Sequence, residues 1–157
     1  MFISLEQAKS HLRVDDYDQD DDITLKIAGA EQIAVAYLNR NVYVDGAALT
    51  AAIALVPAAL VTAAEAYATA DADADLIDDA VTRSIEKAYA FEQYKAAIRS
   101  ADATRNGIVI DDLIRGAMLL ILGDLFENRE DTVAGVSVTK LPNGARKVLS
   151  ARSIEAM

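Results

Sequence analysis

Apolar residues recur at intervals of three and four positions through most of this 157-residue chain. Because an α-helix turns once every 3.6 residues, such intervals place the apolar side chains on one face of a helix. The longest set runs for about five turns and ends near Asn41; it comprises Ile23, Ile27, Ala30, Ala34, Tyr37 and Leu38. The pattern predicts a mainly α-helical protein, and the length fits one domain with a core of its own.

Two helix starts are marked near the N-terminus. Ser4 is followed three positions later by Gln7, the spacing of a capping box, and we expect a short helix that ends near Val14. A run of aspartates follows it. Its last three members, Asp20 to Asp22, stand where carboxylates oppose the positive end of a helix dipole, so they predict the start of a second helix that ends at Asn41.

The middle of the chain is rich in alanine, which favours helix. We expect a helical hairpin here, with a helix break just before Pro57 and a new helix start at residues 71–75. Asn106-Gly107 marks the end of the hairpin. The second helix is predicted to pack through an apolar stripe of Ile77, Val81, Ile85, Ala88, Phe91 and Ile98.

Residues 47–64 carry no charge over roughly the length that a bilayer core requires. Alanine and threonine gain little free energy on transfer to lipid, Pro57 interrupts the segment, and aromatic or basic anchors do not flank it. We therefore expect no membrane span.

A further helix is predicted to begin at Asp111-Asp112. Its centre, residues 117–122, is apolar on every side, and such a helix must be surrounded by neighbours. Beyond residue 131, Val136 and Val138 alternate with polar residues as in a strand, and Pro142-Asn143-Gly144 signals a turn. Val148 and Leu149 could then form a return strand or a docking arm. The predicted fold is a small helical bundle with an inserted alanine-rich helical hairpin and a short C-terminal extended or β-like arm.

The charge and the residue composition exclude several classes of function. The formal charge of −10 repels phosphate backbones and anionic lipid, so tight nonspecific DNA binding is not expected. The chain has no cysteine, which rules out disulfides and thiolate chemistry. Its first residues lack the basic and apolar regions of a secretory signal, and we expect synthesis in the cytoplasm.

No arrangement of residues predicts catalysis, a metal site or a cofactor. An EF-hand pattern started at Asp16 places Asp18 and Asp20 at ligand positions, but Asp21 stands where glycine is required and Ile27 where the bidentate glutamate is required. His11 is the only histidine in the chain. A lone histidine on a short helix is more often a surface or packing residue than a general base. Glycine-rich phosphate-binding loops are not found.

Charged residues near the C-terminus are better candidates for contacts. Arg129 stands at a predicted helix end. We expect its guanidinium to form a forked ion pair within or between subunits rather than to act in catalysis. The last residues are basic, whereas the rest of the chain is acidic, so this tail could reach an adjacent copy. The candidate interface residues are Arg40, Arg129, Glu130, Lys140, Arg146, Lys147 and Arg152.

Several blocks in this order resemble the head-to-tail connector (adaptor) proteins of long-tailed bacteriophages and prophages. The resemblance covers residues 1–45 and 108–157, and the chain departs from the compact members between about Asp45 and Arg105. The blocks are Leu5-Glu-Gln-Ala-Lys-Ser-His-Leu-Arg-Val-Asp15, Asp20-Asp-Asp22, Tyr37-Leu-Asn-Arg40, Asp111-Asp-Leu-Ile-Arg-Gly-Ala-Met-Leu-Leu-Ile-Leu122, Asp124-Leu-Phe-Glu-Asn-Arg-Glu130 and Leu141-Pro-Asn-Gly144.

The resemblance implies a structural role in the virion neck and no enzymatic activity. Identical copies, about twelve by this resemblance, would form a ring beneath the portal, extend the DNA channel without binding DNA specifically, and dock the next neck, stopper or tail protein. We interpret the chain as one connector domain, 1–157, and the residue patterns divide it into N-terminal helices in 1–44, the inserted hairpin in 45–106, a central buried helix in 107–131 and the arm in 132–157. The alternative is a cytoplasmic helical binding module whose acidic loop responds to calcium. An enzyme dependent on His11 or Arg129 is a third hypothesis.

Overall fold

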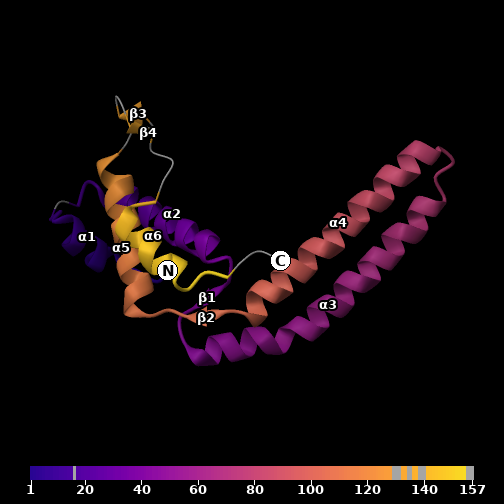
Figure 1. The fold of residues 1–157 in the computed structure, drawn as a ribbon, viewed down its shortest axis with the longest axis horizontal. Helices are drawn as coiled ribbons and strands as arrows, with labels where there is room; N and C mark the ends of the chain where they lie inside the picture. The colour runs from indigo at the N-terminus through magenta and orange to yellow at the C-terminus, as the bar shows by residue number, and fades with distance from the viewer. Residues whose placement is uncertain (16, 129–131, 134–135, 138–140, 155–157) are drawn as a thin grey trace. The chain divides into compact units, whose positions relative to one another are not determined.

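The computed structural model describes residues 1–15, 17–128, 132–133, 136–137 and 141–154. These residues form two compact units. The first, here called the body, combines Met1–Val44 with Ile108–Met157, and the second, the hairpin, is Asp45–Gly107. Six helices dominate the described residues, as Figure 1 shows, and the prediction of a mainly helical fold is confirmed.

The two N-terminal helices of the body begin where the sequence predicts. In α1 (Leu5–Leu12), the Ser4 hydroxyl accepts a hydrogen bond from the Gln7 amide at 3.2 Å while the Gln7 side chain accepts from the Ser4 amide at 3.0 Å. This is the predicted capping box. Helix α2 (Asp20–Leu38) ends before the predicted Asn41, because Asn39 turns into the left-handed region at φ 53° and closes the helix.

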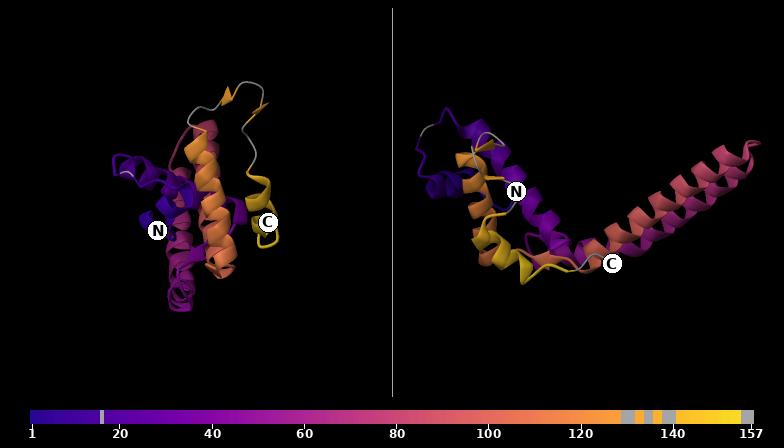
Figure 2. Two further views of the ribbon diagram at one scale, coloured as in Figure 1. Left: turned by 90° about the vertical axis from the view of Figure 1, so that its left-hand side faces the viewer. Right: turned by 45° about the horizontal axis from the view of Figure 1, so that its top comes forward.

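The core of the body lies among α1, α2, α5 (Asp112–Glu127) and α6 (Asn143–Ser150), and α5 contacts each of the other three (Figures 1 and 2). Helix α5 is not enclosed on every side as predicted, because Leu113 and Leu120 are 54% and 43% exposed. The largest fully buried side chains are Ile3, Ile23, Ile27, Leu38, Ile114, Met118, Leu122 and Leu149.

A short parallel strand pair closes the body where the chain leaves it for the hairpin and returns. Strand β1 (Val42–Tyr43) pairs with β2 (Ile108–Val109), with Val42 opposite Ile108. Flanking bonds run from the Ile108 amide to the Asn41 carbonyl (2.9 Å) and from the Ile110 amide to the Tyr43 carbonyl (2.8 Å). The sequence does not predict these strands, since two residues per strand are too few to show a strand pattern.

The hairpin consists of α3 (Gly46–Asp75) and α4 (Ala80–Arg105), which lie side by side along their lengths (Figures 1 and 2). Asp45 and Asp79 cap the two helices, each accepting a backbone amide hydrogen bond at 2.7 Å. The predicted break before Pro57 is wrong, because α3 continues through it. The predicted start at residues 71–75 is also wrong, because those residues complete α3 and the turn lies after them.

The face of α4 that packs on α3 differs from the predicted stripe. Val81 and Ile85 are 68% and 60% exposed, whereas Ala90 and Ala101 are buried. Tyr94 stacks on Tyr67 of α3, with ring centroids 5.5 Å apart. Ala90, Tyr94 and Ala101 follow one another at steps of four and seven residues, so they share the face of α4 that forms the seam, and the small alanines there let the helices approach closely.

The described part of the C-terminal segment combines a short strand pair with one helix, α6. Strands β3 (Thr132–Val133) and β4 (Val136–Ser137) form an antiparallel pair, so Val136 is in a strand as predicted, while Val138 lies outside the described residues. The predicted turn at Pro142-Asn143-Gly144 is wrong. Of the two alternatives for Val148-Leu149, a return strand or a docking arm, the return strand is wrong because both residues lie in α6. Pro142 instead stands at the N-terminal cap of α6. Ala145 and Leu149 are four residues apart on this helix, so they share one face, and both are buried in the core.

Candidate assembly surfaces

Three parts of the body meet around Arg152, just beyond α6. Its guanidinium Nε donates a hydrogen bond to Asp111 Oδ2 at 2.9 Å, and its Nη2 forms an ion pair with the same oxygen at 2.8 Å. Its carbonyl accepts a hydrogen bond from Arg40 Nη1 at 3.3 Å, and the Ile154 amide donates to the Leu38 carbonyl at 3.2 Å. These contacts, here called the C-terminal anchor, tie the end of the described chain to the end of α2 and the start of α5.

Asp111 has two roles in the C-terminal anchor. While Oδ2 holds Arg152, Oδ1 accepts the Ile114 amide at 2.7 Å and caps α5. Partial burial of Asp111 opposes ionisation, but the hydrogen bond from Ile114 and the guanidinium of Arg152 outweigh that effect and lower the pKa of this carboxyl below its ordinary value. The sequence predicted a helix start at Asp111-Asp112, whereas nothing local predicted a partner 41 residues away.

The predicted interface residues fall into three groups. Arg40 and Arg152 contact each other within one chain, so this part of the basic tail is held by its own body. Arg146 and Lys147 are exposed on α6, whereas Ala145 and Leu149 of the same helix are buried. The other three, Arg129, Glu130 and Lys140, lie outside the described residues.

Next to α6 the body exposes leucines that the sequence analysis did not single out. Leu113 and Leu120 stand seven residues apart on α5, which places them on the same side of the helix two turns apart. The Leu120 methyl Cδ1 would lie 3.1 Å from a Cβ at Gly144, so Leu120 borders α6. Their seven-residue spacing could have indicated a shared exposed side of the helix. The continuous apolar run at residues 117–122 concealed this spacing.

Lysines of the same chain form ion pairs with aspartates of the acidic run at residues 15–22. Lys9 Nζ lies 2.6 Å from Asp20 Oδ1, and Lys26 Nζ lies 2.6 Å from Asp22 Oδ2. Within the described part of the chain, which excludes residue 16, three or more potential metal ligands do not come together anywhere. The lysine pairs neutralise two of the carboxylates that a calcium site would need.

His11 packs against a glycine of α5. Its Nε2 would lie 3.7 Å from a Cβ at Gly123, an ordinary contact distance. With Ser10 and Leu119, His11 also lines an open hollow of about 570 Å³ beside α1. A side chain larger than alanine at Gly123 would meet the imidazole, so the glycine allows α1 and α5 to approach.

The candidate surfaces of the body consist of exposed leucines on α5 and basic side chains on α6. The hairpin is inserted in the sequence between α2 and α5. These surfaces define a protein that works through contacts with other proteins. Residues 2–152 match the family described as phage gp6-like head-tail connector protein, and the chain belongs to that family. No curated protein and no solved structure matches it. The resemblance seen in the sequence is therefore confirmed, and the chain is a structural connector of the phage head–tail junction.

Proposed function

We propose that copies of this chain form a ring beneath the portal in the virion neck, extend the DNA channel and dock the next neck or tail protein without catalysing a reaction. The observation that carries the proposal is the family match over residues 2–152. By the family resemblance the ring holds about twelve copies, and heterologous contacts between identical subunits are what closes a ring.

The exposed side of α5 and α6 is the proposed contact surface of the body. Leu113 and Leu120 present apolar area to solvent, and Arg146 and Lys147 place positive charge on the neighbouring helix. Covering two large apolar side chains stabilises a contact by up to about 1.5–3 kcal/mol each. The basic side chains can steer an acidic surface, either of the next copy or of the portal.

The net charge of −10 suits a wall past which DNA must move. A field of that sign repels phosphates, so DNA in the channel would not adhere to the ring.

The test combines the full-length chain with purified portal and measures assembly by light scattering and electron microscopy. We expect rings, alone at high concentration or on the portal, and we expect Leu120→Asp to reduce assembly at least tenfold. Leu25→Asp is the matched control, because Leu25 is 72% exposed on α2 and lies outside the proposed surface. A chain that stays monomeric at every concentration, with and without portal, would contradict the proposed function.

A further inference from the structure

The hairpin buries little of its own apolar surface. Four of its residues are buried, namely Val56, Ala74, Ala90 and Ala101. Large apolar side chains remain more than a third exposed along both helices. They are Ile53, Leu55, Val61, Leu76, Val81, Ile85, Tyr89 and Phe91.

One flank of the hairpin is a groove of about 580 Å³ between α3 and α4. Small side chains of α3, including Ala63, Ala66 and Ala70, form one wall, and Tyr89 and Gln93 of α4 form the other. Its charged lining residues, Asp73 and Glu86, both lie toward the turn between the helices. A wall of alanines gives a shallow apolar surface on which larger side chains can rest.

The opposite flank carries larger apolar side chains, and we call it the ridge: Ile53, Val61 and Ala68 on α3 and Phe91 on α4. None of these four lines the groove. Two positions along a helix correspond to a rotation of about 200°. Ala68 therefore points away from Ala66, and Phe91 points away from Tyr89. Ile53, Val61 and Phe91 are 38%, 57% and 47% exposed.

We propose that the groove of one hairpin receives the ridge of the hairpin of a second copy. The argument for a second copy is that both flanks of the same hairpin expose apolar side chains, and that the groove is walled by small side chains where the ridge carries the larger Ile53, Val61 and Phe91. A different partner seated in the groove would leave Phe91 and Val61 bare. A heterologous contact between identical copies covers both flanks, because each copy offers its groove to one neighbour and its ridge to the next.

The dimensions fit a stable contact. Helix α4 has 26 residues and is therefore about 39 Å long, and two helices side by side are about 20 Å wide. One flank thus offers up to about 800 Å², the area that each partner buries in an interface of standard size. Residues 46–64 of α3 carry no charge, so few ionised groups lose hydration there.

A lipid bilayer is the competing partner. By length and composition α3 is long and apolar enough to span a membrane, and its most apolar stretch is almost unburied. Its companion α4 nevertheless carries Arg83, Lys87, Lys95 and Arg99 together with acidic residues along the same length. Burying that many charges in hydrocarbon is unfavourable, which favours a protein partner.

Cross-linking of engineered cysteines tests the contact, since the chain has none of its own. The full-length double variant Ala66→Cys/Ala68→Cys places one thiol on each flank, and the two point too far apart to join within one chain. We expect oxidation to give a ladder of covalent oligomers beyond the dimer, and each single variant to stay mostly monomeric under denaturing conditions. Dimers from Ala66→Cys alone would indicate a two-fold contact and overturn the proposal, as would double variants that never cross-link.

A pair of arginine variants provides the second test. Ala66→Arg places a charge in the groove, whereas Ala51→Arg makes the same change at an exposed α3 position that does not line the groove and that, two residues before Ile53, points away from the ridge. We expect Ala66→Arg to weaken self-association at least tenfold and Ala51→Arg to leave it unchanged, with equal helix content. Flotation of the wild type, but not Ala66→Arg, with phosphatidylcholine vesicles would assign the groove to lipid and overturn the proposal.

This inference deepens the proposed function and rests on it for the closure of a ring, yet the two can fail separately. Rings that form on the portal without cross-links between hairpins would refute the hairpin contact alone. A covalent ladder from a chain that never binds the portal would support the hairpin contact and contradict the proposed neck role.

Discussion

Arg152 holds one oxygen of Asp111 through a hydrogen bond from Nε and an ion pair from Nη2, while the other oxygen of the same carboxylate caps α5. One side chain therefore couples the start of the central helix to the end of the described chain. Because Arg40 in turn holds the Arg152 carbonyl, the end of α2 belongs to the same network.

Removing the Asp111 carboxylate should destabilise the body. We expect Asp111→Ala to lower the free energy of unfolding by about 1–2 kcal/mol, because the helix cap and the ion pair are both lost. Asp111→Asn keeps a capping acceptor and should cost no more than about 1 kcal/mol. Asp112→Ala is the control, since that side chain is 99% exposed, and urea unfolding measures all three. Equal effects of the Ala and Asn changes would contradict the capping role.

The stability of the body should fall in acid partly through Asp111. The pKa of this carboxyl is lower in the folded protein than its ordinary value of 3.8, so the unfolded chain binds its proton first as the pH drops. The stabilising effect is present above the ordinary value and is lost as the pH falls through the folded pKa. Unfolding experiments from pH 6 down to about pH 3 should show a shallower loss for Asp111→Asn than for wild type. Parallel curves would show that Asp111 does not contribute.

Much of this architecture follows from local chemistry, and the errors have a common physical cause. The capping box at Ser4 and the cap at Asp111 depend on neighbours within three residues, so their spacing predicts them. On α4, however, two sets of apolar residues share helical spacing, one through Val81 and Ile85 and one through Ala90 and Ala101. Larger side chains favoured the first set, but close approach to α3 selected the smaller alanines.

Long-range pairings were beyond the reach of sequence patterns. The parallel pair of Val42 with Ile108 joins segments separated by the whole hairpin, and two-residue strands carry too little periodicity to detect. Arg152 was singled out for its charge, but its partner Asp111 is 41 residues away and already had a local role as a cap. Helix α6 was missed because Pro-Asn-Gly is a strong turn signal that tertiary packing overrode.

The two glycines of α5 should respond differently to alanine. Gly116 has no other atom within 4 Å of its would-be Cβ, so Gly116→Ala should stabilise the isolated chain by about 0.5–1 kcal/mol through helix propensity alone. Gly123→Ala introduces a methyl group 3.7 Å from His11, an ordinary contact, and should be neutral or stabilising, whereas Gly123→Leu should separate α1 from α5. Thermal unfolding measures each variant. Destabilisation by Gly116→Ala in the monomer would contradict the open environment of that position.

Pro57 should limit the stability of the hairpin. Proline lacks the amide that would bond the carbonyl of Ile53, and its ring crowds that carbonyl. We expect Pro57→Ala to stabilise α3 by about 1–3 kcal/mol, read as slower amide hydrogen exchange in residues 50–64. Ala58→Gly, at the next position, is expected to change stability in the opposite direction by up to about 1 kcal/mol. Unchanged or faster exchange in Pro57→Ala would mean that neighbouring contacts already compensate for the missing bond.

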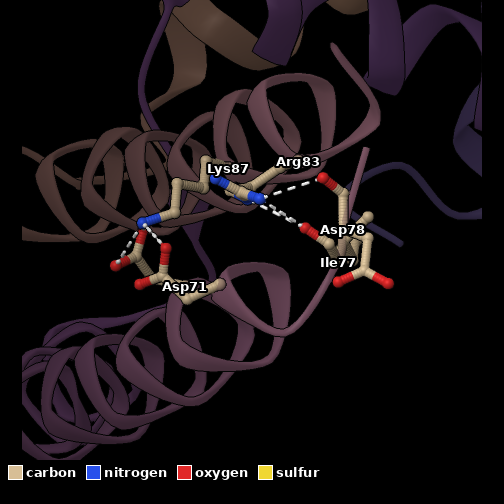
Figure 3. Close-up of polar contacts among 6 residues, drawn as sticks. Asp71, Ile77, Asp78, Arg83 and Lys87 are labelled. Atoms are coloured by element: carbon tan, nitrogen blue, oxygen red, sulfur yellow. Dashed lines mark hydrogen bonds and ion pairs between the residues drawn. The ribbon is translucent and has the colours of Figure 1, made fainter. Parts of the chain in front are cut away.

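Arg83 holds the turn between α3 and α4, and its guanidinium geometry should be required (Figure 3). Its Nε and Nη2 donate to the Ile77 carbonyl at 2.9 and 2.7 Å, and Nη2 also donates to the Asp78 carbonyl at 3.2 Å. Lysine has one ammonium group and cannot supply this planar fork. We expect Arg83→Lys and Arg83→Gln each to destabilise the hairpin by about 1 kcal/mol, because the carbonyls of Ile77 and Asp78 in the turn lose a charged donor. Faster amide exchange confined to residues 74–86 would report the loss. Arg99→Gln, an exposed position on the same helix, should leave that exchange unchanged, and a Lys variant as protected as wild type would show that charge alone holds the turn.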